Sequence, residues 1–242
     1  MLNLNADLGE SWYDNIVGND EQLMPLLDSC NIACGIHGGD ALTMKRTIGL
    51  AQKHNVAIGA HPSFPDRKNF GRVRMELTME QLEAFLLYQV SALQGMVEAQ
   101  GGKLHHIKPH GALYHYLNET PEAAGALMRI AKAKDVELVY GPPTGALRTA
   151  AESAGLNFWP EGFADRRYEP TLHLRSRLKK NASIHDPADA VAQVRLMATE
   201  QAVIAVDGNK YPLHVKTVCI HGDHEGALQK AQAIRQFLNE LR

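Results

Sequence analysis

The chain has little of what several large classes of protein need. Its 242 residues include only three cysteines, Cys30, Cys34 and Cys219, and no CxxC pair. An odd, low count of this kind favours reduced thiols over a disulfide framework and predicts a cytoplasmic protein. The formal net charge is only −2, and no basic stripe or block of like charge stands out. This balance argues against nucleic acid or an anionic membrane as the main partner.

Membrane and nucleotide-binding signals are also missing. No apolar run reaches the roughly 18 residues that a membrane-spanning helix needs. The first residues have neither a basic n-region nor an apolar h-region, so no signal peptide is expected. There is no GxGxxG after the first apolar run and no GxxxxGK(S/T). Dinucleotide-binding and P-loop folds therefore lack their fingerprints.

What the chain does have is a regular alternation of short apolar runs and longer amphipathic ones. The short runs predict buried strands at residues 2–4, 31–33, 56–60, 104–107, 137–140, 158–159 and 217–220. The longer runs predict helices at residues 40–55, 78–100, 121–134, 145–154, 187–201 and 224–241. This order predicts an α/β fold with a mostly parallel sheet, closed or nearly closed as a TIM-like (β/α) barrel, in a single domain over residues 1–242.

Local signals support several of these boundaries. Asp40 is an N-cap candidate, and Thr78 stands three residues before Gln81 with the spacing of a capping box. Between residues 202 and 215 the rhythm changes, because Asp207-Gly208 separates two apolar runs. That dipeptide predicts a β-hairpin outside the main sheet.

Polar side chains gather where the predicted strands end. Six strand ends supply His, Asp, Glu or Lys beside glycine or proline, and in (β/α) barrels catalytic groups come from these ends. We expect the catalytic residues to be Asp7, Glu10, His37, His61, Lys108, His110, Glu161, Asp165, His221 and Asp223, with Asp7, His61, Lys108 and His110 at the centre. We expect the residues that bind substrate or nucleotide to be Asn5, Asn31, Gly38, Gly39 and Arg166.

Each of these residues also has an ordinary structural interpretation. An Asp before a helix, such as Asp40 or Asp223, often only caps it. A strand-end histidine such as His61 often only packs, and Cys34 fits a buried thiol better than an activated nucleophile. Histidine and aspartate can also hold a metal, but no HExxH-like spacing requires one. A catalytic site is favoured because such polar residues recur at six predicted strand ends.

Six ordered blocks of sequence resemble the LamB/YcsF family, and they run from Asn5 to Asp223, nearly the whole chain. The blocks are Asn5-Ala6-Asp7-Leu8-Gly9-Glu10, Asn31-Ile32-Ala33-Cys34-Gly35-Ile36-His37, Ile58-Gly59-Ala60-His61-Pro62-Ser63-Phe64-Pro65-Asp66, Lys108-Pro109-His110-Gly111-Ala112-Leu113-Tyr114, Glu161-Gly162-Phe163-Ala164-Asp165-Arg166 and Thr217-Val218-Cys219-Ile220-His221-Gly222-Asp223.

This resemblance implies a seven-stranded barrel of the glycoside hydrolase/deacetylase type. Members of the family act as the A subunit of a bacterial ATP-dependent 5-oxoprolinase. The implied reaction is the opening of 5-oxoproline (pyroglutamate) to L-glutamate, driven by hydrolysis of ATP to ADP and phosphate. Two partner subunits, B and C, are implied as well. Two alternatives remain open: a metal-dependent deacetylase of N-acetyl sugars or related amides, and a non-catalytic lactam-binding regulatory protein.

ATP would enter with Mg²⁺, which carboxylates such as Asp7 or Glu10 can hold, while Gly38 and Gly39 can offer N–H groups to phosphate. Lys108 is expected to lie along the barrel axis, because Pro109 keeps its backbone extended at the end of a buried strand. The competing interpretation is a surface lysine whose stem covers apolar neighbours. As a mouth residue, Lys108 is expected to tolerate replacement by Ala without loss of the fold.

Overall fold

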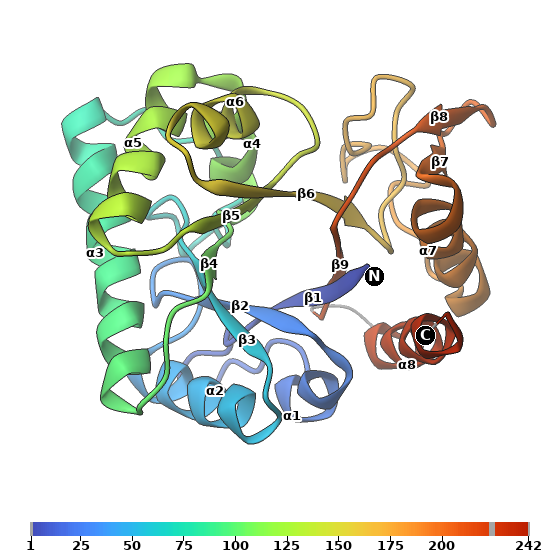
Figure 1. Cartoon of the computed structure of the whole chain (residues 1–242). Coiled ribbons are helices and arrows are strands. Elements are labelled where there is room, and N and C mark those ends of the chain that lie inside the picture. Colours follow the sequence, from blue (N-terminus) through green and yellow to red (C-terminus); the bar gives the residue numbers. More distant parts are fainter. Residues whose placement is uncertain (1, 223–225, 242) are drawn as a thin grey trace.

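The architecture is a closed barrel of seven parallel strands. A computed structural model describes residues 2–222 and 226–241. Around the barrel the strand order is β1-β2-β3-β4-β5-β6-β9, and β9 closes it by pairing with both β6 and β1 (Figure 1). The strands are β1 (Asn3–Leu8), β2 (Ser29–Ala33), β3 (Ala57–His61), β4 (His106–Ile107), β5 (Leu138–Gly141), β6 (Asn157–Phe163) and β9 (Thr217–His221). The predicted seven-stranded (β/α) barrel is confirmed.

Alternation along β1 explains how the barrel interior is filled. Leu4, Ala6 and Leu8 belong to the apolar core, whereas the side chains of Asn5 and Asp7 bond to polar groups of other strands. Successive strand residues point to opposite sides, so one side of β1 is apolar and the other polar. The prediction that this strand ends at residue 4 was wrong, because Asn5 and Asp7 lie within the strand.

The same alternation gives the barrel a hydrogen-bonded polar interior. The Nδ2 of Asn31 donates to Oδ1 of Asn5, and its Oδ1 lies 2.7 Å from Nε2 of His106. The ring of His106 stacks on Tyr140 with centroids 3.9 Å apart. Gly59 makes room for this stack, since a Cβ there would lie 2.1 Å from the His106 ring. Barrels of this kind usually hold layers of branched apolar side chains at these positions.

Strand β6 completes the barrel by changing partner halfway along. Residues 157–160 pair with β5, and residues 161–163 pair with β9. Pro160 lies at the change, and its carbonyl accepts a hydrogen bond from Lys216 N just before β9. The switch places Glu161 and Phe163 on the part of the strand that pairs with residues 217–219 of β9.

Helices surround the barrel (Figure 1). They are α1 (Asp20–Leu23), the 3₁₀ turn η1 (Met24–Leu26), α2 (Ala41–Lys53), α3 (Met79–Ala99), α4 (Gly111–Glu119), α5 (Pro121–Ala133), α6 (Ala146–Ser153), α7 (Pro187–Glu200) and α8 (Ala227–Glu240). The Asp40 side chain accepts a hydrogen bond from Thr43 N, and the Thr78–Gln81 capping box is formed. Asp40 is therefore a helix cap. Sequence analysis did not anticipate α1, η1 or α4.

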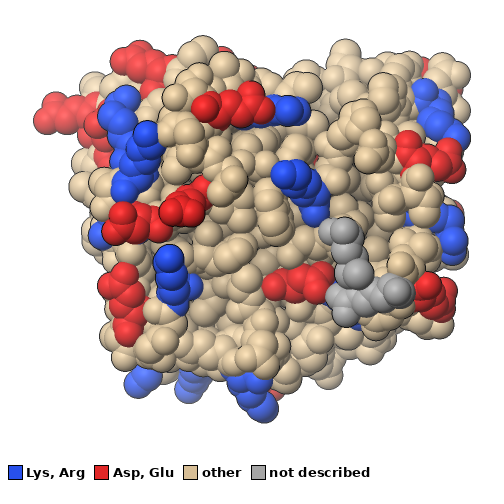
Figure 2. Space-filling view, viewed as in Figure 1, with Lys and Arg blue, Asp and Glu red and all other residues tan. Residues whose placement is uncertain are grey.

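Outside the barrel, β7 (Ala202–Ile204) and β8 (Lys210–Pro212) form the antiparallel hairpin predicted from Asp207-Gly208. Gly208 has φ +81°, as such a turn requires. Lys or Arg and Asp or Glu are interspersed over the face shown in Figure 2. Among the described residues, no helix is both long and apolar enough to span a bilayer. All three cysteines are buried and unpaired.

Candidate active site at the barrel mouth

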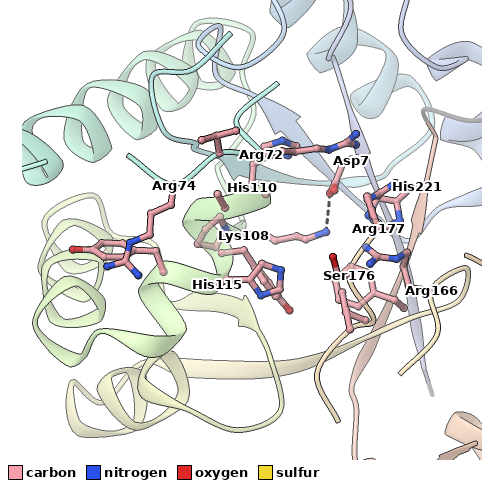
Figure 3. Close-up of a pocket in the computed structure, with 18 of the residues that line it drawn as sticks. Asp7, Arg72, Arg74, Lys108, His110, His115, Arg166, Ser176, Arg177 and His221 are labelled. Carbon is pink, nitrogen blue, oxygen red and sulfur yellow. Dashed lines mark hydrogen bonds and ion pairs between the residues drawn. The ribbon is translucent and has the colours of Figure 1, made fainter. Parts of the chain in front are cut away.

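A buried lysine is the centre of the site. Lys108 directly follows β4, and its N–H donates to the carbonyl of Ala60, which prolongs the ladder with β3. The residue is only 2% exposed. The ammonium lies 2.8 Å from Oδ1 of Asp7 (Figure 3). It also lies 3.2 Å from Oε1 of Glu161. Lys108 is thus enclosed in the barrel rather than at the surface.

The three charged groups differ in their proton affinity. Burial alone would lower the pKa of Lys108, but the charges of Asp7 and Glu161 outweigh it and raise that pKa well above its usual range. Burial also opposes the ionised form of Asp7, yet the nearby His61 and Lys108 hold the Asp7 pKa well below its usual range. The pKa of Glu161 is raised by burial, which Lys108 offsets only in part. The site therefore pairs an ionised carboxylate with one that holds its proton more readily.

Two asparagines below the lysine orient these carboxylates. Asn5 donates to Oε1 of Glu161 at 3.0 Å, and Asn31 donates to Oδ1 of Asp7 at 2.8 Å. Both asparagines are completely buried. They lie beneath the acidic groups, in the polar barrel interior, and position them. Contact of these asparagines with substrate or nucleotide stays a prediction.

Three histidines and Glu10 adjoin Asp7 on the other side from Lys108. Nε2 of His61 lies 3.3 Å from Oδ2 of Asp7 and 2.9 Å from Nδ1 of His110. Glu10 lies 3.6 Å from Nδ1 of His110 and 3.1 Å from Nε2 of His37. Burial lowers the pKa of both His37 and His110 well below the usual value, which keeps these rings neutral near pH 7.

Gly38 and Gly39 pack behind Glu10. The N–H of Gly39 donates to the Glu10 carbonyl, and a Cβ at Gly38 would lie 2.9 Å from that same oxygen. Both glycines are buried. Phosphate binding by these glycines stays a prediction, and the Gly39 N–H would have to leave Glu10 to take part.

A second His–carboxylate pair stands at the end of β9. Nδ1 of His221 lies 3.0 Å from Oδ1 of Asp165, and the His221 N–H donates to Oδ2 of the same carboxylate. The His221 ring also stacks on Phe163, with centroids 5.6 Å apart. Asp165 is buried behind the histidine, so it orients His221 and does not face the opening.

These groups open into one pocket of about 750 Å³, a volume typical of small-molecule sites. Of the predicted residues, it is lined by Asp7, Glu10, His61, Lys108, His110, Arg166 and His221. His37, Glu161 and Asp165 lie directly behind this lining, in contact with it. Asp223 lies outside the described residues. The structure brings the remaining predicted catalytic residues together at the barrel mouth, while their chemical roles stay predictions.

Sequence reasoning missed the basic rim of this pocket and one neighbour of Lys108. Arg72, Arg74 and Arg177 line the opening together with Arg166 (Figure 3). Burial lowers the pKa of Arg166 to about 10, which still leaves it charged. Cys219 lies 3.0 Å from the lysine ammonium. Two sequence signals were available: Arg72 follows Gly71 in the long segment after β3, and Cys219 lies in the last of the six family blocks.

Comparison with known proteins gives the chain relatives over its full length. The LamB/YcsF family profile matches residues 2–242. A protein from Bacillus cereus (strain Q1), named as the A subunit of 5-oxoprolinase, is 43% identical over 98% of this chain and 95% of its own length. One of the same name from Methylococcus capsulatus is 45% identical over 98% and 92%. The crystal structure of the lactam utilization protein from Thermus thermophilus superposes with a TM-score of 0.93 at 38% identity, covering 99% of this chain and 96% of that one. The chain belongs to the LamB/YcsF family.

Proposed function

We propose that this chain is the A subunit of an ATP-dependent 5-oxoprolinase, which opens 5-oxoproline to L-glutamate while ATP is hydrolysed to ADP and phosphate. The observation that carries the proposal is the floor of the pocket. There an ionised Asp7, a buried Lys108 and Glu161, whose pKa is raised by burial, meet within hydrogen-bond distance, in a chain 43–45% identical to proteins that bear the name of this 5-oxoprolinase component.

The proposed reaction needs activation of a poor electrophile. A five-membered lactam is a stable amide, so transfer of the γ-phosphoryl group of ATP to the lactam oxygen, with departure of ADP, makes its carbon reactive. Water then adds to this carbon, and the C–N bond breaks as the ring nitrogen takes a proton. The resulting acyl phosphate reacts with a second water to give glutamate and phosphate.

Three residues of the pocket floor suit these steps. The ammonium of Lys108 neutralises negative charge that develops on the lactam oxygen. Because the site is buried, this electrostatic interaction is stronger than it would be in water. Asp7 is ionised and accepts a proton from the attacking water. Glu161 has a raised pKa and can donate a proton towards the departing nitrogen. An acid and a base with separated pKa values are the usual requirement of such chemistry.

The rim of the pocket suits an anionic substrate. Arg72, Arg74, Arg166 and Arg177 surround the opening above Lys108 (Figure 3). A guanidinium binds carboxylate or phosphate oxygens with two parallel hydrogen bonds. The carboxylate of 5-oxoproline and the transferred phosphoryl group both meet this description. We propose that the rim holds the substrate carboxylate while the lactam carbonyl reaches Lys108.

In this proposal the partner subunits B and C take part in binding ATP. The chain carries no P-loop or dinucleotide fingerprint, so the handling of ATP and its Mg²⁺ is shared with subunits B and C. The purified chain alone is then expected to show little or no net ring opening. Its pocket would contribute the lactam site and the acid–base groups.

Glutamate formation is the test. The chain, its B and C partners, 5-oxoproline, ATP and Mg²⁺ are combined, and glutamate and phosphate are quantified. Equal amounts of both products support the proposal. Acetate release from N-acetyl sugars without glutamate would replace it by deacetylation. Tight binding of 5-oxoproline by a complete complex that never turns over would replace it by a lactam-sensing role.

A further inference from the structure

The histidine cluster contains a pair of rings whose hydrogen bonds determine where their protons lie. Nδ1 of His61 is 2.7 Å from the carbonyl oxygen of Lys108, and Nε2 of His110 is 2.8 Å from the carbonyl oxygen of Phe70. A carbonyl oxygen only accepts, so both of these nitrogens carry a hydrogen. In the neutral rings, Nε2 of His61 and Nδ1 of His110 are therefore left with bare lone pairs.

These two lone pairs face one another. Nε2 of His61 and Nδ1 of His110 are 2.9 Å apart, and both rings are buried. Two acceptors at that distance repel unless a cation lies between them or beside them. Two carboxylates adjoin the same point: Glu10 at 3.6 Å from His110 Nδ1, and Asp7 at 3.3 Å from His61 Nε2. Two imidazole lone pairs and nearby carboxylate oxygens form the donor set of a metal ion.

We propose that His61 Nε2, His110 Nδ1 and Glu10 Oε1 bind a divalent transition-metal ion at the pocket floor. Ligand atoms about 2.1 Å from a tetrahedral ion lie about 3.4 Å from each other, and the separations of 2.9 and 3.6 Å bracket that value. Mixed nitrogen and oxygen donors suit zinc, iron or cobalt, whereas Mg²⁺ prefers oxygen alone. Binding of Mg²⁺ together with ATP, by carboxylates such as Asp7 or Glu10, stays a separate prediction.

His37 belongs to the cluster but does not complete the ligand set. All four side chains offer donor atoms within 4.8 Å of one another. However, the His37 ring lies parallel to that of His110, at 6° and 3.7 Å between centroids. A metal lies in the plane of each imidazole that binds it, so two stacked rings cannot share one ion at about 2.1 Å. His37 instead donates its Nε2 hydrogen to Glu10 and orients that carboxylate.

The fourth coordination position is left to a water or a substrate oxygen. Catalytic zinc sites keep such a position open beside three protein ligands. Asp7 lies 3.3 Å from the proposed ligand atom Nε2 of His61. It can therefore accept a proton from a water bound at this fourth position. The site is proposed from its geometry alone and needs neither ATP nor 5-oxoproline. Failure of the metal test would therefore leave the proposed ring opening standing, and the reverse also holds.

The test is metal binding by the full chain without substrate. After dialysis against a chelator, the protein is titrated with Zn²⁺ and with Co²⁺. Bound metal is measured after desalting, and the Co²⁺ ligand-field absorption and the melting temperature are recorded. We expect one ion per chain, visible bands typical of nitrogen and oxygen ligands, and a melting temperature that rises with metal concentration.

Four variants locate the ion. His61→Gln and His110→Gln should each weaken binding by more than about 100-fold, while His37→Phe, which keeps the stack and loses the bond to Glu10, should cost about 10–100-fold. His185→Gln, an exposed histidine remote from the pocket, is the matched control and should bind as the wild type does. A folded wild-type chain that takes up neither metal overturns the proposal. So does unchanged affinity in both His61→Gln and His110→Gln.

Discussion

Replacement of Lys108 by Met tests how the pocket floor is held together. Met keeps the apolar stem and removes the charge, which leaves Asp7 and Glu161 buried without the cation between them. Removal of one partner from a buried ion pair costs about 3–5 kcal/mol. Sequence analysis predicted that the fold survives truncation of this lysine. The structure adds a stability cost to that prediction, because Lys108 is 2% exposed and bridges two carboxylates.

The loss in free energy of unfolding caused by Lys108→Met should be large but smaller than the total stability of the domain. A domain has about 5–15 kcal/mol of total stability, so the variant should fold. Its melting temperature should fall by about 6–20 °C, at about 2–4 °C per kcal/mol for a chain of this size. The double variant Lys108→Met/Glu161→Gln should recover part of the loss, because the second change removes one uncompensated carboxylate.

Urea unfolding followed by circular dichroism measures these changes. Lys210→Met is the matched control, since its ammonium also pairs with a carboxylate, Glu200, but at the surface. Exposed pairs are worth about 0–1 kcal/mol. In the reconstituted complex, Lys108→Met should lower kcat by about 10²–10³-fold. Lys108→Arg should restore little of this activity, because the planar guanidinium of arginine does not fit the place of a compact ammonium. A Lys108→Met protein within about 0.5 kcal/mol of the wild type would refute the reasoning.

Three further predictions concern the interior, pH and partners. Gly59→Ala places a Cβ 2.1 Å from the His106 ring and should destabilise by about 1–3 kcal/mol through overpacking, measured by urea unfolding; an unchanged midpoint would contradict it. Burial raises the pKa of Asp20 above 3.8, so its contribution to stability is lost as pH rises through the folded-state pKa. Asp20→Asn should therefore gain stability relative to the wild type between about pH 4 and 7, and parallel curves would show otherwise. The purified chain should release glutamate only when subunits B and C are added; full turnover without them would remove the need for partners.

The order of elements was predictable because each strand and helix carries its own periodicity. All seven barrel strands and the hairpin were predicted, with shifted ends. The first strand was predicted too short because its polar residues were assigned to a loop. Asn3, Asn5 and Asp7 alternate with Leu4, Ala6 and Leu8, and this period of two indicates a strand with a polar interior side. Read in this way, the sequence would have placed Asp7 inside β1.

The residues that form the site were predictable, but which of them face the pocket and which lie beneath it was not. Strand-end position brought Asp7, His61 and Lys108 to one pocket, because parallel strands all end at the same side of a barrel. Whether a residue faces the pocket or lies beneath it depends on contacts between distant strands, such as that of Asn5 with Glu161, 156 residues away. No local pattern encodes such a contact. The same holds for the orientation of His37 against His110, from which the metal ligands are inferred.

The most direct test of the central claim compares two complexes that differ in one atom group of the pocket floor. Subunits B and C are combined with the wild-type chain or with Asp7→Asn, and glutamate formed from 5-oxoproline and ATP is measured per complex. Asn keeps the size of the side chain and removes the charge that faces Lys108 and His61. If the lactam reacts above this floor, the variant should lose at least about 10²-fold in kcat while it remains folded and bound to its partners. Undiminished glutamate formation by the folded Asp7→Asn complex would place the reaction elsewhere.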